Sequence, residues 1–147
     1  IIDDFKIIKP KILLAGINPH AGEKGLISQN DDKYLKPIIE KLKRTKIDID
    51  GPISGDAMIS EKNLKKYNVF LFTYHDHALI PFKMISKFKG INYTSGLKVI
   101  RVSPSHGTGR DIIGTKFASA QGILNSFKTI KKIYKNRINN WLIQKNL

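Results

Sequence analysis

The sequence contains no cysteine, no long uncharged apolar run and few acidic residues. Without cysteine it can form neither a disulfide scaffold nor a thiolate metal site. It holds no window of about 18 uncharged apolar residues, so we expect no membrane-spanning helix and no membrane partner. Ile1-Ile2-Asp3-Asp4 has neither the basic nor the apolar region of a signal peptide. We therefore expect a cytoplasmic protein, and its 147 residues are enough for one core.

Acidic residues number only 12 against 26 basic ones, which gives a net charge of +14. A chain this basic is typical of nucleic-acid binders. Only four of the basic residues are arginine, however, and arginine is the side chain whose planar fork reads bases and phosphates. The lysines are spread through the whole chain among Ile and Asn residues. The composition therefore favours a solvated lysine surface and argues against a nucleic-acid partner.

Short apolar runs alternate with helical patterns along the chain. The predicted strands cover residues 11–17, 46–50, 68–74, 91–94 and 98–102. The predicted helices cover 31–44 with Asp31 or Asp32 as the cap, 54–67, 81–87, and 115–144 with a break near Asn125. The strand 68–74 is apolar almost throughout, as a central parallel strand would be. This alternation predicts an α/β fold with a largely parallel sheet and flanking helices.

Polar side chains stand at the ends of several predicted strands, where open α/β sheets bind their ligands. His20 follows the first strand and Asp56 the second, His75 and Asp76 end the third, and Arg101 ends the last. Neutral imidazole beside carboxylate suits Zn²⁺ and similar ions, and arginine suits an anion. Each of these residues has a plainer interpretation as a capping, first-turn or surface side chain. The glycines after Arg101 do not form the G-x-G-x-x-G of a Rossmann turn.

Taken together, these segments resemble one family, the 4-hydroxythreonine-4-phosphate dehydrogenases of the vitamin B6 pathway. The segments that carry the resemblance are Leu14-Ala-Gly-Ile-Asn-Pro-His-Ala-Gly-Glu23, Gly51-Pro-Ile-Ser-Gly-Asp56, Tyr74-His-Asp76 with Pro81 and Lys83, Asn92 with Gly96, Ile100-Arg101, and Ser103-Pro-Ser-His-Gly-Thr108 with Asp111. The match runs from about residue 11 to residue 120 and covers only the C-terminal half of the family's chain.

The resemblance implies a fold like that of isocitrate and isopropylmalate dehydrogenases, with two α/β domains and a homodimer whose active site lies at the subunit interface. Residues 1–77 would belong to the second domain, which carries the metal site and the dimer contact. Residues 78–147 would form the C-terminal part of the first domain. The N-terminal half of the family fold would be absent, so the two-domain subunit would be incomplete.

The resemblance also implies an enzyme that acts on a phosphorylated hydroxy-amino acid. With NAD or NADP it would oxidise 4-phosphooxy-L-threonine at its 3-hydroxyl, and decarboxylation would give 3-amino-2-oxopropyl phosphate for pyridoxal 5'-phosphate synthesis. A divalent ion (zinc, magnesium or cobalt) would polarise the hydroxyl. The implied roles are metal binding by His20 and His75, catalysis by Asp56, Asp76 and Lys83, substrate binding by Lys83, Asn92 and Arg101, and cofactor binding by Ser103, His106, Gly107, Thr108 and Asp111.

Several interpretations stay open on the sequence alone. His77-Ala78 stand where the family usually has Gln-Gly, and Ser105 replaces an acidic residue. The chain is therefore either part of an active enzyme, an inactive truncated remnant, or a basic binding module on the same fold. A paralogue that oxidises D-threonate or D-erythronate 4-phosphate is a further alternative.

We predict that the isolated 147-residue chain is poorly soluble or partly unfolded despite its charge. Part of a two-domain fold exposes sheet edges and apolar faces that the missing part would cover. Light scattering and a thermal melt of the purified chain measure this. A sharp cooperative melt of a monomer would contradict the prediction.

Overall fold

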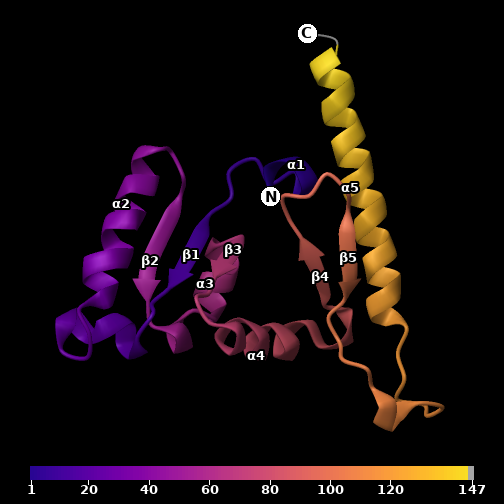
Figure 1. Cartoon of the computed structure of the whole chain (residues 1–147), viewed down its shortest axis with the longest axis horizontal. Coiled ribbons are helices and arrows are strands. Elements are labelled where there is room, and N and C mark those ends of the chain that lie inside the picture. Colours follow the sequence, from indigo (N-terminus) through magenta and orange to yellow (C-terminus); the bar gives the residue numbers. More distant parts are fainter. Residues whose placement is uncertain (146–147) are drawn as a thin grey trace. The chain divides into compact units, whose positions relative to one another are not determined.

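The chain divides into two compact units, which we describe separately (Figure 1). The computed structural model describes residues 1–145, and side chains up to residue 139. The sheet unit comprises Ile8–Pro81, and the hairpin unit comprises Ile1–Ile7 together with the chain from Phe82 onward. Helix α4 (His75–Ser86) contains the boundary between them.

The sheet unit is built on three parallel strands in the order β2-β1-β3. These are β1 (Ile12–Ala15), β2 (Ile49–Ile53) and β3 (Val69–Leu71), and Ile12 of the central strand is in register with Ile49 and Val69. The π-helical turn η2 (Asp31–Leu35) and helix α2 (Lys36–Arg44) join β1 to β2. The 3-10 turn η3 (Gly55–Ala57) and helix α3 (Glu61–Lys66) join β2 to β3.

The central strand is buried because helices and loops cover both faces of the sheet. Alternate residues of a strand point to opposite faces, so Leu13 and Leu14 enter different clusters. Leu13 packs with Ala15 and Met58, and Leu14 packs with Ile39 of α2 and with Ile49. Burying each large side chain contributes roughly 1.5–3 kcal/mol. The apolar character of β1 thus reflects a strand with two covered faces.

The hairpin unit pairs two antiparallel strands with the long helix α5 (Figure 1). Strand β4 (Ile91–Thr94) lies against β5 (Arg101–Pro104), and α5 (Gln121–Lys145) packs along β5 and against the short helix α1 (Ile2–Phe5). The 3-10 turns η4 (Lys87–Lys89) and η5 (Arg110–Ile112) lie in the connections.

The α/β fold with parallel strands and flanking helices is as predicted, but several elements differ from the sequence analysis. The predicted central strand 68–74 is wrong in position, because β3 is short and lies at the edge of the sheet, with Leu71 48% exposed. Its other apolar residues, Phe70 and Phe72, pack onto the cluster around Leu13. These side chains are apolar because they pack on one face of the sheet, and β1 is the central strand.

The predicted start of helix α4 is also wrong, because it begins at His75 and Pro81 lies inside it. His75 and Asp76 therefore lie in its first turn and do not end a strand. An acidic residue in a first turn is favoured by the helix dipole. In the hairpin unit Arg101 begins β5 and does not end it.

The second strand and the last helix also differ from the prediction. The second strand lies at Ile49–Ile53 and not at 46–50. Helix α5 continues through Asn125 without the predicted break. The Asn125 side chain donates to the Lys89 carbonyl at 2.9 Å and accepts from Gln121 Nε2 at 3.0 Å. A tertiary hydrogen bond thus occupies the amide that could have interrupted the helix.

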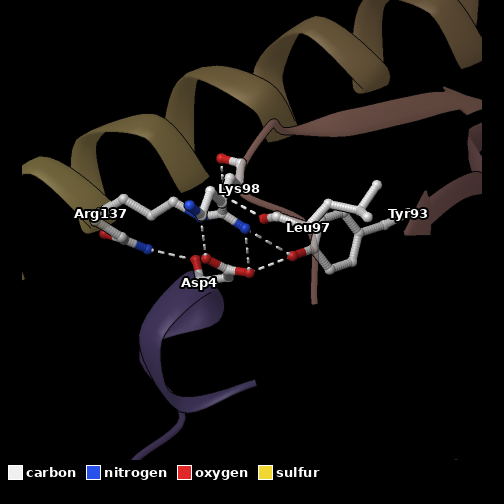
Figure 2. A network of polar contacts seen from close by, with 6 residues as sticks. Asp4, Tyr93, Leu97, Lys98 and Arg137 are labelled. Atoms are coloured by element: carbon white, nitrogen blue, oxygen red, sulfur yellow. Dashed lines mark hydrogen bonds and ion pairs between the residues drawn. The ribbon is translucent and has the colours of Figure 1, made fainter. Parts of the chain in front are cut away.

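An ion pair holds α1 against α5 and the β4–β5 hairpin (Figure 2). Arg137 donates from Nε to Asp4 Oδ1 at 2.6 Å and from Nη2 to Oδ2 at 3.0 Å. Its Nη1 reaches the carbonyls of Leu97 at 3.0 Å and Lys98 at 2.9 Å, and the Tyr93 hydroxyl also donates to Asp4. The Asp4 and Arg137 side chains are only 13% and 26% exposed. The hydrogen bond from Arg137 therefore lowers the pKa of Asp4 to about 2.

We predict that Asp4→Asn lowers the free energy of unfolding by about 2 kcal/mol at neutral pH. The folded pKa of Asp4 lies below its ordinary value of 3.8, so its contribution is complete above about pH 4 and is lost as the pH falls through about 2. Urea unfolding followed by circular dichroism at several pH values measures the difference. Asp111→Asn makes the same charge change at an exposed position and serves as control. A loss that is equally large at pH 2 would refute the assignment to this carboxylate.

Candidate functional site

The carboxyl ends of the three parallel strands open into one cavity of about 740 Å³ within the sheet unit. Since β1, β2 and β3 are parallel, the segments that follow them meet at the same edge of the sheet. The cavity is lined by Ile17, Asn18, Pro19 and His20 after β1, by Ser54, Gly55, Asp56 and Ile59 after β2, and by Tyr74, Asp76, His77, Ile80 and Pro81 at α4.

Three of the predicted site residues line this cavity together: His20, Asp56 and Asp76. His75 does not line it. Its side chain is 78% exposed, and its Nδ1 lies 2.7 Å from Asp76 Oδ1. The roles assigned to these four residues stay predictions.

His77, which was not among the predicted site residues, lines the same cavity. Its ring stacks edge-on against Tyr74 with the centroids 5.2 Å apart. It also packs close to Gly55, where an added Cβ would come within 3.2 Å of the imidazole Nδ1. Tyr74 and His77 are three residues apart, a spacing that brings side chains together on a helix but not on a strand. A helix assigned to residues 75–77 would therefore have predicted the contact between these two rings.

Asp56 is the carboxylate of the cavity whose charge is most clearly set by its neighbours. The Ser54 hydroxyl donates a hydrogen bond to Asp56, and the nearby His20 also lowers the pKa of this carboxyl. The hydrogen bond from Ser54 lowers the pKa of Asp56 below its ordinary value. Asp56 is therefore a carboxylate at neutral pH and offers an acceptor for a hydroxyl or a cation.

A divalent ion needs more ligands than the described residues bring together. Among the described residues, no group of three His, Cys, Asp or Glu side chains is placed to hold a metal ion. Two of the predicted site residues, His20 and Asp56, lie in the cavity. The residues that the structure describes therefore do not by themselves form a complete metal site.

The predicted substrate and cofactor residues belong to the hairpin unit. Lys83, Asn92 and Arg101 are all exposed, and Arg101 Nη1 donates to Thr94 Oγ1 at 3.0 Å. Among the predicted cofactor residues, Ser103 is paired with Asn92 in the β4–β5 hairpin.

A second cavity of about 270 Å³ lies in the hairpin unit, and it contains three of the predicted cofactor residues, His106, Gly107 and Thr108. Phe88, Ile112, Ile113 and Ala118 supply its apolar wall. Asp111 lies nearby in η5 but is not part of the lining.

Within the residues described, none of the helices combines the length and apolarity needed to cross a bilayer.

Comparison with known proteins gives one consistent result. The family model described as pyridoxal phosphate biosynthetic protein PdxA matches residues 1–130. A 4-hydroxythreonine-4-phosphate dehydrogenase from Paracoccus denitrificans is 38% identical over 125 residues, which are 85% of this chain and 39% of that protein. The resemblance predicted from the sequence motifs is therefore confirmed.

Solved structures agree with the sequence relatives. The crystal structure of 4-hydroxythreonine-4-phosphate dehydrogenase from Klebsiella pneumoniae matches with a TM-score of 0.71 and 30% identity, over 86% of this chain and 39% of that one. A terephthalate 1,2-cis-dihydrodiol dehydrogenase from Burkholderia xenovorans matches with a TM-score of 0.59 and 27% identity, over 88% of this chain and 41% of that one. The chain thus spans about two fifths of the length of the proteins it matches.

We predict that Ser54→Ala raises the pKa of Asp56 toward its ordinary value, because the hydrogen bond from the serine hydroxyl is the largest influence lowering it. An NMR titration of the Asp56 carboxyl carbon measures the shift. Ser60→Ala, which removes the cap of α3 outside the cavity, serves as the matched control. An unchanged Asp56 titration in Ser54→Ala would show that the hydroxyl does not set its charge.

Proposed function

Because the chain belongs to the PdxA family of pyridoxal phosphate biosynthetic proteins, we propose that it provides the C-terminal part of a 4-hydroxythreonine-4-phosphate dehydrogenase. The reaction is the oxidation of 4-phosphooxy-L-threonine at its 3-hydroxyl by NAD or NADP, followed by decarboxylation to 3-amino-2-oxopropyl phosphate. The proposal includes the isocitrate-dehydrogenase-like fold, a homodimer with the active site at its interface, and a cytoplasmic location.

The observation that carries the proposal is the cavity at the carboxyl ends of β1, β2 and β3. It gathers two carboxylates, Asp56 and Asp76, and two imidazoles, His20 and His77, from separate segments of the chain. Such a collection of ionisable groups in one concave site is typical of proton-transfer chemistry. Its apolar walls, which include Ile17, Ile59 and Ile80, would limit access of water to a bound substrate.

The reaction breaks three bonds: the O–H and C–H bonds at C3, and the bond between C2 and the carboxylate. The 3-hydroxyl loses a proton and C3 loses a hydride, which makes a 3-oxo acid. The bond between C2 and the carboxylate then breaks, CO₂ leaves, and C2 takes up a proton. Asp56 and Asp76 both line the cavity, which supports a role in accepting the hydroxyl proton and in returning one.

Bound cofactors would supply the remaining chemistry: the nicotinamide accepts the hydride, and a divalent ion lowers the pKa of the reacting hydroxyl. His20 and His75 are the metal ligands implied by the family, and the described residues supply no group of three metal-ligating side chains. The proposal therefore requires assembly with further polypeptide.

The hairpin unit carries the groups suited to the charged ends of the substrate and to the cofactor. The cations Lys83 and Arg101 suit a phosphate or a carboxylate, and Asn92 offers a neutral polar contact. The smaller cavity around His106, Gly107 and Thr108 is the proposed cofactor contact, with Ser103 and Asp111 beside it in sequence.

The substrate is the least constrained part of the proposal. The Burkholderia xenovorans relative is named for a dihydrodiol, so proteins with this fold oxidise more than one kind of secondary alcohol. D-threonate and D-erythronate 4-phosphates share the phosphate and the secondary hydroxyl of the proposed substrate. They are therefore the alternatives to test beside it.

The decisive experiment assays the chain alone and after co-expression with the remaining part of the Paracoccus denitrificans relative. Formation of reduced nicotinamide is followed with 4-phosphooxy-L-threonine and with the two alternative phosphates, in the presence of Zn²⁺, Mg²⁺ or Co²⁺. We predict activity from the assembled protein and none from the chain alone. In the assembly, Asp56→Asn should lower kcat by roughly 100-fold.

Asp48→Asn is the matched control, because Asp48 is exposed and lies outside the cavity. It should leave kcat and KM unchanged. Activity only with an alternative phosphate would identify a paralogue. Absence of activity with every substrate and metal would favour an inactive remnant of the family and overturn the proposal.

A further inference from the structure

Asp31 is a charged side chain buried beneath the loop that carries His20. It has no solvent exposure and is the only charged side chain in the buried core of the described residues. Its Oδ1 accepts from the Ile17 amide at 2.8 Å, and its Oδ2 accepts from the Asn18 amide at 3.2 Å and from Asn18 Nδ2 at 2.9 Å. Burying a carboxylate is costly unless donors surround it, and here three N–H groups do so.

The loop that follows these bonds has an unusual backbone. His20, Ala21, Gly22, Glu23 and Lys24 have φ values of 51°, 49°, 78°, 46° and 53° and form a short left-handed turn. Residues other than glycine avoid this region, so such a turn persists only where its surroundings hold it.

The structure supplies those constraints both within the turn and before it. Gly22 accepts from the Ile27 amide at 3.1 Å, and a Cβ at Gly22 would come within 2.3 Å of the Ser28 carbonyl oxygen. Before the turn, a Cβ at Gly16 would come within 2.7 Å of Asp31 Oδ1. The backbone therefore packs directly against the carboxylate that binds Ile17 and Asn18.

We propose that Asp31 is a positioning residue of the cavity: by binding Ile17 and Asn18, it fixes where the left-handed turn places His20. Any effect of Asp31 on catalysis rests on the function proposed above. Asp31 does not line the cavity itself and acts only through the loop.

The alternative role predicted from the sequence, a helix cap, does not describe this side chain. Neither η2 nor α2 has a side-chain hydrogen bond at its start. The neighbouring Asp32 pairs with Lys36 one turn along the helix, as a surface helical acid does. The two adjacent aspartates thus differ in role, and this difference provides a matched control.

The test compares Asp31→Asn with Asp32→Asn in the 147-residue chain, which is co-expressed with the remaining part of the Paracoccus denitrificans relative if the isolated chain is partly unfolded. Amide hydrogen exchange at Ile17 and Asn18 and the NMR signals of the His20 ring are measured. We expect exchange at both amides at least about tenfold faster in Asp31→Asn, with the His20 ring signals moved toward those of an unstructured peptide. The signals of His106 in the hairpin unit, and all signals in Asp32→Asn, should stay in place.

The test must also distinguish a change in the His20 loop from a general loss of stability. Ile39→Ala destabilises the same unit through its core without touching the loop, so the folded protein should keep the native His20 signals. Asn18→Ala removes one of the three hydrogen bonds and should shift His20 in the same direction by less, which keeps the test valid if Asp31→Asn does not fold. Native His20 signals in the Asp31 and Asn18 variants, or equal shifts in Ile39→Ala, would overturn the proposal.

The NMR result is independent of catalysis, so it separates this proposal from the proposed function. In an active assembly, Asp31→Asn should lower kcat/KM by roughly 10- to 100-fold while Asp32→Asn does not. An inactive wild-type assembly would overturn the proposed function alone, because the His20 signals still decide the role of Asp31.

Discussion

The parallel pairing of β2 and β3 on either side of β1 is the constraint on which the candidate site depends. Parallel strands run in the same direction, so the segments that leave their carboxyl ends are delivered to one edge of the sheet. Burial of Leu13 and Leu14 on opposite faces of β1 fixes that strand in the middle. His20 and Asp56, 36 positions apart in the sequence, line one cavity for this reason.

Charge is used in two different ways in this protein. Most of its excess of basic residues consists of lysines scattered along the chain, which fits a solvated surface. A few charges instead hold backbone in place. Arg137 binds Asp4 and two carbonyls of the hairpin unit, and Asp31 binds two amides before His20. Such paired, shielded groups contribute more to local order than exposed ion pairs do.

The proposed function links these features to a chain that spans about two fifths of its relatives. The sheet unit offers carboxylates and imidazoles in one cavity, and the hairpin unit offers exposed cations and a smaller glycine-containing cavity. Among the described residues, neither set includes a group of three side chains placed to hold a metal ion. The half-exposed Leu71 on the edge strand β3 agrees with a proposal in which further polypeptide completes the assembly.

The sequence alone determined the family, the α/β class and the first strand, because these follow from local motifs and from an apolar run between turn residues. It also placed His20 and Asp56 after strands, whereas Asp76 lies in the first turn of α4. Only the tertiary structure decided that β1 and not β3 is central, since strand order depends on pairing between distant segments. It also showed that His77 lines the cavity, because residues 75–77 are helical. The hydrogen bonds between Asp31 and the His20 loop likewise depend on tertiary structure, because folding alone brings the carboxylate to these amides.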